Sequence, residues 1–500
     1  MKPALDFAGG STQKQFQVHP IPVNDYTRWR TQHGLPAMLC EAASGPSEKL
    51  LQAIWLHQRL QRDNLRTLDD RPVRVLHPGF ISVEGGPDFR GAVLQFAAAP
   101  PVSGDVEIDV ADAGWRGHGH ARNPAFKNVI LHVVWEGRAN STALPTLALC
   151  NVLDAPLTEL VSQLELESLR TLPKDWVGRC RAPLRHLAPD ALADLLRTAA
   201  QVRLHNKAAL LEARARRVGW EQTWWEGLFR ALGYKHNRWP MQHLAEVRHI
   251  WRPGVTAPFA AQIRLFGLSG LLPVELRRNR PATDAYLRRI WDVWWREREI
   301  FAAHVLPRAA WRLHGIRPAN QPLRRLALAA HWSQQRDLIA QVEAWSLSSG
   351  TAARLAATLT KIFRVPTDPF WSWHWTLHGA RLQRPQPLIG EQRVTDLAIN
   401  TVLPWLLARA RAGGNNALAE EIVRRYQAWP AAEDNAVLRL ARQRLLGGSL
   451  RGGAELKSAS AQQGLLQIVR DFCDHSNALC EACRFPELAA GWRRRPESEC

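Results

Sequence analysis

A chain of 500 residues, 46% of them hydrophobic, is long enough for two to four domains and at least one large core. No apolar run reaches the ~18 residues of a membrane span, and the first residues lack the apolar centre of a secretory signal, so we expect a cytoplasmic protein with no membrane partner. Of the 65 basic residues nine are lysines, which leaves 56 arginines; the net charge of +19 favours an anionic partner such as nucleic acid, although a GC-rich genome is an alternative cause of the arginine excess.

The sequence up to about residue 155 predicts an N-terminal arm followed by an α+β module. Residues 1–45 are polar, rich in Gly and Pro and without periodicity, which predicts a loose N-terminal arm. Pro46-Ser47-Glu48 then opens a stretch with apolar residues at helical spacing. The alternating apolar segments that follow predict about five strands of a mixed sheet, over 73–83, 91–97, 104–110, 127–137 and 144–152. We therefore predict one module over residues 46–155.

The rest of the chain predicts helices. Residues 156–455 carry apolar stripes near the 3.6-residue period, with Arg and Glu on the opposite face, and residues 456–500 add a last helix and a cysteine cluster. No fixed-period repeat is present, which disfavours a solenoid. The 22 tryptophans lie mainly on the apolar stripes, for instance Trp291, Trp294 and Trp295, and we favour core packing over base stacking for them.

Three acidic residues in or beside the predicted strands indicate a metal site. Asp88 follows a Gly-Gly-Pro turn, while Glu107 and Asp109 are two residues apart and therefore share one face of a strand. A hairpin would bring Asp88 beside them, and converging carboxylates suit the Mg²⁺ or Mn²⁺ that phosphodiester cleavage requires. Glu48, on the preceding helix, is a further candidate acid. The alternative is a hairpin whose acids are merely solvated.

The arrangement resembles the PD-(D/E)xK nucleases. Their signature is Pro-Asp, a strand, and then an acid, any residue and a lysine; here Pro87-Asp88 and Glu107 match, but Asp109 stands in place of the lysine. The resemblance implies a restriction-endonuclease-like fold and metal-dependent cleavage of nucleic acid, in which the lysine would position or activate the attacking water. Lys127 or Arg90 could substitute for it.

Histidines follow the acidic residues. His118 and His120 are two apart and His132 lies in a nearby predicted strand, so their imidazoles could share a metal or act as general base and phosphate contact. The candidate catalytic residues, of which Asp88 and Glu107 are also metal ligands, are Asp88, Glu107, Asp109, His118, His120 and Lys127.

Longer segments resemble a bacterial family called domain of unknown function 2851. The similarity rests on "HPGFISVEGGPDFRGA", "HGHARNPAFKNVILHVVWE", "GWEQTWWEGLFRALGYKHNRWPMQHLA" and "AQQGLLQIVRDFCDHSNALCEACRF", in family order from about residue 47 to 490. Asp109 stands where members usually carry histidine, and Asn123 where they tend to carry aspartate. The resemblance implies a shared polar site that includes Asp88, Glu107, His118 and His120, but it implies no established activity.

Arg317 and Arg324 are candidate nucleic-acid contacts. With Asn320 and Arg325 they occupy a loop that enters a predicted helix, where arginines could hold phosphate beside the helix N-terminus. The alternative is a structural turn that Pro318 fixes and in which Asn320 caps the helix.

Cys473, Cys480 and Cys483 predict a second metal site. A Cys-x-x-Cys pair with a third cysteine nearby suits Zn²⁺ or an iron–sulfur cluster, and the alternative is a redox-active or merely buried pair. The fourth ligand stays open among His475, Cys500, Cys40, Cys150 and Cys180; Cys40 has the position that such clusters use in some nucleases.

Two functions of different class follow. The first is a divalent-metal-dependent nuclease that acts on nucleic acid. The second is a non-catalytic nucleic-acid-binding or scaffold protein with a structural zinc or iron–sulfur site.

Overall fold

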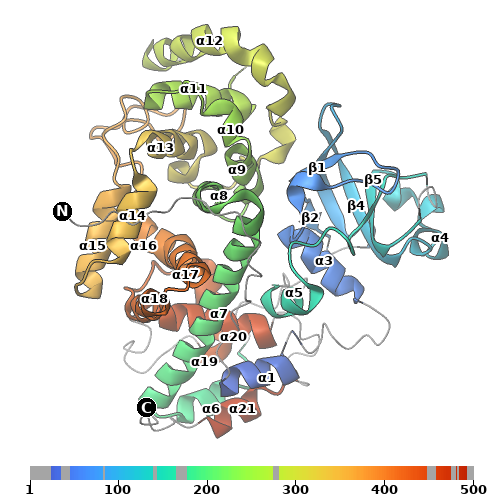
Figure 1. Ribbon diagram of the computed structural model, residues 1–500, viewed down its shortest axis with the longest axis vertical. Coiled ribbons are helices and arrows are strands. Elements are labelled where there is room, and N and C mark those ends of the chain that lie inside the picture. The colour runs from blue at the N-terminus through green and yellow to red at the C-terminus, as the bar shows by residue number, and fades with distance from the viewer. Residues whose placement is uncertain are drawn as a thin grey trace.

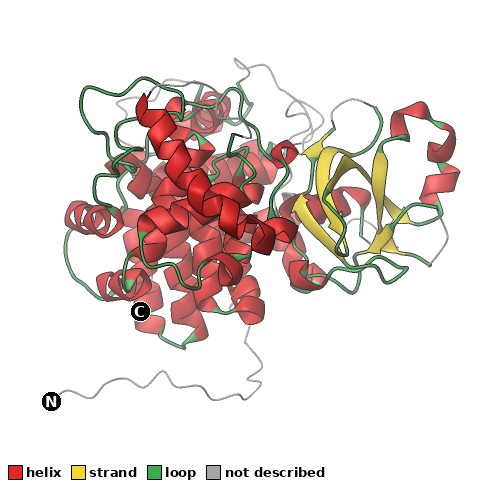
Figure 2. Cartoon of the chain, turned by 90° about the horizontal axis from the view of Figure 1, so that it is seen from above, coloured by secondary structure: helices red, strands yellow, loops and turns green. Residues whose placement is uncertain are grey.

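A sheet module stands beside a larger helical body (Figure 1), and the view from above shows the sheet on one side of the helices (Figure 2). The predicted α+β class, a mixed sheet with helices followed by a mostly helical region, is confirmed. The computed structural model describes residues 24–34, 36, 46–82, 85–138, 143–164, 177–273, 281–447, 458–473, 480 and 483–492. Among these residues, no helix is both long and apolar enough to cross a lipid bilayer.

The described sheet has six strands in the order β1-β3-β4-β5-β6, with β2 paired to β3 beside this path. The first pairings are antiparallel, whereas β4, β5 and β6 are parallel. The predicted strand over 73–83 is divided into β1 and β2, because Pro78 has no N–H to donate and Gly79 has a φ of +95°. The strands are β1 (Val73–His77), β2 (Phe80–Ile81), β3 (Phe89–Phe96), β4 (Val102–Ala111), β5 (Val129–Glu136) and β6 (Thr146–Ala148).

Helix α3 (Glu48–His57) packs on the sheet. Its backbone begins where the Ser47 side chain accepts a hydrogen bond from the N–H of Leu50, as the N-cap signature predicts. Its buried residues, among them Ile54 and Trp55, belong to one apolar cluster with the residues of β3, β4 and β5. Burial of this face fixes the helix against β4 and places its first turn at the end of the sheet where β3 begins.

A crossover that contains short helices joins β4 to β5. Parallel neighbours need such a connection, because a tight turn reverses the chain direction. The crossover contains α4 (Gly114–Gly117) and the 3-10 helices η2 (His120–Arg122) and η3 (Pro124–Phe126). Trp115 and Phe126 anchor it in a small apolar cluster with Val129.

The helical body is built around α7 (Pro189–Val218), a helix of 30 residues that runs along much of its length (Figure 1). Helix α20 (Ala459–Phe472) packs along α7. The other α-helices are α5 (Leu157–Gln163), α6 (Arg181–His186), α8 (Trp220–Leu232), α9 (Arg238–Glu246), α10 (Arg248–Trp251), α11 (Pro258–Leu268), α12 (Pro281–Phe301), α13 (Pro322–Gln334), α14 (Leu338–Ser346), α15 (Ala352–Phe363), α16 (Glu391–Leu397), α17 (Leu403–Ala412), α18 (Asn416–Ala428), α19 (Ala436–Leu446) and α21 (Phe485–Gly491).

Tryptophan packing fills much of this body. Trp224, Trp251, Trp332 and Trp405 are each fully buried, which confirms the predicted core role for them. Trp295 is 59% exposed on α12 and is an exception.

Helix α1 (Asp25–His33) ties the N-terminal segment to α20. The hydroxyl of Tyr26 donates to Asp471 Oδ2 at 2.8 Å, and Arg30 Nε donates to Asp471 Oδ1 at 2.9 Å. Tyr26, Arg30 and Asp471 are all buried. The prediction of a loose arm over residues 1–45 is therefore wrong for this helix. The polar composition of the segment does not indicate that Tyr26 and Arg30 bind the carboxylate of Asp471, which is distant in the sequence.

Candidate functional site

Asp88 and Glu107 meet where β3 and β4 lie side by side. Asp88 immediately precedes β3, and its Oδ2 accepts a hydrogen bond from the backbone N–H of Ile108 in β4, at 3.0 Å. In return, the backbone N–H of Asp88 donates to Glu107 Oε2 at 3.1 Å. The antiparallel pairing thus brings the two predicted metal ligands together at one end of the hairpin.

Helix α3 contributes two further groups to this site. The side-chain amide of Gln52 donates to Asp88 Oδ1 at 2.9 Å and to Glu48 Oε1 at 3.0 Å. Gln52 therefore links the exposed Glu48 to the half-buried Asp88. Glu48 is the acid that the sequence offered as a further candidate, and Gln52 is a site residue that it did not suggest.

The histidines face the second strand of the hairpin. His132 in β5 is fully buried, and its Nε2 lies 2.9 Å from Asp109 Oδ2; the other oxygen, Oδ1, lies 3.2 Å from Nδ1 of the exposed His118. His120 Nε2 lies 3.2 Å from Glu107 Oε1 but lacks the angles of a hydrogen bond. Asp109, His118 and His120 each offer one ligand atom within 4.8 Å of the others, which is compatible with a shared metal ion.

Burial and mutual repulsion raise the pKa values of the acidic groups. Burial, and then the charge of Asp88, raises the pKa of Glu107 to about 8. Burial, and then the charge of Glu48, raises the pKa of Asp88 to about 7. The pKa of Glu48 is also raised, by partial desolvation of its carboxyl group and then by the charge of Asp109. The pKa of His120 is lowered, chiefly by burial. Such crowding of acids is what a bound cation would relieve.

The candidate substitutes for the missing lysine lie outside this group. Lys127 is exposed at the end of η3, and among the described residues it forms no hydrogen bond or ion pair with the acids. Arg90 is exposed too, and its Nη2 donates to the backbone oxygen of Gly85 at 3.1 Å. The place of the lysine is taken by Asp109, whose carboxylate faces His132 and His118 instead.

A family model described as "Protein of unknown function (DUF2851)" matches residues 48–436, more than three quarters of the chain. The chain belongs to this family. The match includes the whole acidic and histidine site of this DUF2851 protein, from Glu48 to His132. No curated protein and no solved structure matches the chain, so the restriction-endonuclease-like fold stays a prediction.

In this DUF2851 protein the three arginines near Pro318 have different surroundings. Arg317 is exposed before the 3-10 helix η6 (Pro318–Asn320). Arg324 is 1% exposed, and its guanidinium donates to backbone carbonyls, including that of Pro387 at 3.1 Å. Arg325 donates to Leu388 O and to Asn320 Oδ1, both at 2.8 Å. The burial of Arg324, whose Nη groups donate to these carbonyls, argues against the predicted contact with nucleic acid. Asn320 holds Arg325 and does not cap α13.

The C-terminal cysteines lie against the start of α6. Cys473, Cys480 and Cys483 are half-buried, and Cys180 is buried at the N-cap of α6. Cys150 follows β6 in the sheet module. The remaining predicted ligands Cys40, His475 and Cys500 lie outside the described residues.

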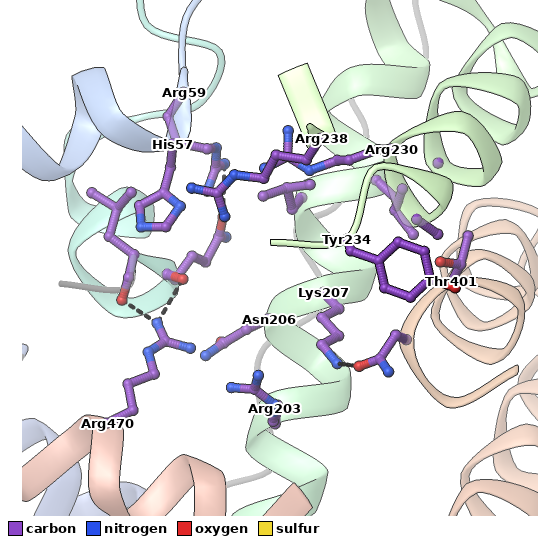
Figure 3. A pocket seen from close by; sticks show the side chains of 17 residues that line it. His57, Arg59, Arg203, Asn206, Lys207, Arg230, Tyr234, Arg238, Thr401 and Arg470 are labelled. Atoms are coloured by element: carbon purple, nitrogen blue, oxygen red, sulfur yellow. Dashed lines mark hydrogen bonds between the residues drawn. The ribbon is translucent and has the colours of Figure 1, made fainter. Parts of the chain in front are cut away.

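A basic cavity of about 500 Å³ lies between the sheet module and the helical body (Figure 3). Its described lining contains six Arg or Lys residues and no Asp or Glu. No sequence pattern indicates this cavity, because the lining residues are scattered from His57 to Arg470 and only the fold brings them together.

Proposed function

We propose that this DUF2851 protein is a divalent-metal-dependent nuclease whose active site is the group around the β3–β4 hairpin. The observation that supports it is the meeting of Asp88 and Glu107, two carboxyl groups with pKa values raised to about 7 and 8, beside a His120 Nε2 that has no hydrogen-bond partner among the described residues. Uncompensated acids of this kind are costly without a cation, and they cluster at functional sites.

Part of the donor set fits a divalent ion. Among the described residues, Asp109, His118 and His120 offer one carboxylate oxygen and two imidazole nitrogens within 4.8 Å of one another. Asp88 and Glu107 offer further oxygen ligands beside this group. Carboxylates suit Mg²⁺ and Mn²⁺, whereas imidazole is a poor ligand for Mg²⁺, so the mixed set favours Mn²⁺. When bound, the ion would polarise a phosphoryl oxygen and acidify a water molecule.

The side chains of the site would have different roles in metal binding and in contact with the substrate. Asp88 and Glu107 would hold the ion, and the backbone N–H of Ile108 fixes the carboxylate of Asp88 for this purpose. His132 is fully buried and orients the carboxylate of Asp109. His118 is the most exposed imidazole of the site, so we assign to it the contact with the attacking water or with the phosphate.

A specific observation favours the second candidate, a non-catalytic nucleic-acid-binding protein. No lysine or arginine among the described residues occupies the place of the motif lysine, and Asp109 adds a negative charge there. A site without that cation stabilises a developing negative charge less well.

A cleavage assay separates the two candidates. We expect the purified protein to cut single- or double-stranded DNA or RNA in Mn²⁺, more slowly in Mg²⁺, and not at all with excess chelator. Denaturing gel electrophoresis of end-labelled substrates measures the products. Absence of products with Mn²⁺, Mg²⁺, Co²⁺ and Zn²⁺ would leave the non-catalytic candidate standing.

A further inference from the structure

Four cysteines from separate parts of the chain gather where α6 meets the C-terminal helices. They are the N-cap of α6, the C-cap of α20 and two residues that precede α21: Cys180, Cys473, Cys480 and Cys483. All four are free thiols, and none is exposed. Helix α6 packs against both α19 and α21, and Figure 1 shows α6 and α21 together at the lower end of the helical body. The fold therefore brings together thiols that are far apart in the sequence.

Two of the sulfurs border one small space. The position that a Cβ on Gly178 would occupy lies 3.1 Å from Cys180 Sγ and 3.6 Å from Cys480 Sγ. The loop that carries Cys180 is held there, because Arg179 Nη1 donates to the backbone oxygen of Cys480 at 3.3 Å. The backbone N–H of Gly178 donates to the backbone oxygen of Arg444, in the last turn of α19, at 2.7 Å. These hydrogen bonds fix the start of α6 beside the segment that contains Cys480.

A tight turn carries the Cys-x-x-Cys pair. The backbone N–H of Cys483 donates to the backbone oxygen of Cys480 at 3.4 Å, and Cys480 has a φ of +74°. The Sγ of Cys483 lies 3.8 Å from the backbone oxygen of Phe472, the residue immediately before Cys473. The turn thus contacts the start of α6 through Cys480 and the end of α20 through Cys483.

The cysteines also share an apolar environment. Cys180 is 5% exposed and belongs to an apolar cluster that includes Phe485. Cys473 and Cys483 pack against the same cluster. Burial, and then the charges of Cys480 and Cys483, raises the pKa of Cys180 to about 12. A metal ion that entered this environment would displace the thiol protons and bind thiolates.

We propose that these four cysteines form a metal centre in which Cys180 is the fourth ligand. Four thiolates suit tetrahedral Zn²⁺, at Zn–S distances of about 2.3 Å, or an iron–sulfur cluster. In the described part of the chain no three of the sulfurs lie within 4.8 Å of one another, so metal binding would draw them together by rotation of the side chains. Among the described candidates for the fourth ligand, Cys150 belongs to the sheet module, whereas Cys180 adjoins Cys480.

The centre would stabilise a part of the fold that has short helices. Helices α6 and α21 have six and seven residues, and helices of this length are not stable in water without tertiary contacts. Leu184 provides the buried apolar side chain of α6. A metal held by four thiolates would join α6, α20 and the segment before α21, because the free energy of metal binding becomes free energy of folding.

Cys180 couples this metal to the folded state. Cys473, Cys480 and Cys483 lie in one short segment, so an unfolded chain can also bind a metal through them. Cys180 precedes Cys473 by roughly 290 residues and joins the other three only when the chain is folded. The stabilising effect of the metal should therefore depend on Cys180.

Cys180→Ser tests the centre, with Cys150→Ser as the matched control. We expect the wild type and Cys150→Ser to contain about one zinc ion per chain, or iron with visible absorbance, and Cys180→Ser to lose most of the metal on dialysis against a weak chelator. Complete removal of the metal should lower the melting temperature of the wild type and of Cys150→Ser, but not that of Cys180→Ser. Mass spectrometry of the metals measures the content, and scanning calorimetry measures the melting temperature.

Replacement of the metal by Co²⁺ gives a readout that the acidic site does not affect. Thiolate ligands give Co²⁺ an intense charge-transfer absorption that carboxylate and imidazole ligands lack. We expect this absorption in the wild type and a weaker one in Cys180→Ser, with circular dichroism as the check that the variant is folded.

Two results would overturn the proposal without any variant. The first is a wild type that contains neither zinc nor iron after purification without chelators. The second is a disulfide between Cys180 and Cys480 in place of the metal, detected by mass spectrometry of non-reduced peptides. Full metal content and an unchanged Co²⁺ spectrum in folded Cys180→Ser would equally overturn the assignment of Cys180. None of these results depends on cleavage of nucleic acid.

Discussion

Replacing Asp88 by asparagine is expected to lower Mn²⁺-dependent cleavage of nucleic acid by at least about a hundredfold. Asparagine keeps the size of the side chain and can still accept the hydrogen bond from Ile108, but it removes the negative charge that would hold the ion. Binding of the substrate should be unchanged or tighter, because one negative charge near the phosphates is lost.

The matched control for this variant is Asp105→Asn. Asp105 lies in the same strand as Glu107, and its Oδ1 accepts a hydrogen bond from Gly91 at 3.1 Å, outside the acidic group. We expect the Asp105→Asn variant to cleave nucleic acid at the wild-type rate. Cleavage by Asp88→Asn at the wild-type rate would show that Asp88 does not hold the ion, whereas equal loss in both variants would indicate a folding defect.

The second large effect concerns stability and pH. The pKa of Glu107 is raised to about 8 and that of Asp88 to about 7, whereas in the unfolded chain both groups ionise near pH 4. A raised folded-state pKa contributes stability at low pH that is lost as the pH rises toward the folded-state value. The metal-free protein should therefore lose stability between about pH 4 and pH 8 and change little above that range.

Glu107→Gln isolates this contribution, because glutamine cannot ionise. At pH 8 we expect the metal-free variant to be more stable than the wild type by about 2 kcal/mol, and at pH 5 we expect the difference to be small. Mn²⁺ should raise the melting temperature of the wild type more than that of the variant, since the ion binds the charged acids. Scanning calorimetry measures both effects. A difference between the two proteins that does not change from pH 5 to pH 8 would contradict the assignment.

The sequence predicted what depends on local patterns. The N-cap at Ser47 and the alternation around Glu107 are readable within a few residues, and they suffice for the α+β class and for the pairing of the β3–β4 hairpin. The spacing of His118 and His120 also made them candidate site residues from the sequence alone. Each of these signals lies within one element or between neighbouring elements.

What the sequence did not predict depends on distant contacts. His132 faces Asp109 only because β5 pairs in parallel with β4, a pairing that alternation within one strand does not specify. The burial of Arg324 was equally hidden, because an arginine at the start of a predicted helix suggests solvent exposure, whereas here carbonyls near Pro387 accept hydrogen bonds from its Nη groups. The sequence offered Cys180 among several possible ligands, and only the fold places it beside Cys480.

The attachment of α1 to α20 has a consequence for protein synthesis. Tyr26 and Asp471 are 445 residues apart, so a ribosome that adds about 5–20 residues per second needs roughly 20–90 seconds to supply the partner of the tyrosine. During that time the sheet module, whose residues are close in sequence, can fold before α20 has been synthesised. Helix α1 cannot complete its contacts until α20 has emerged from the ribosome. The early segment that precedes the module is thus among the last parts of this chain to reach its final surroundings.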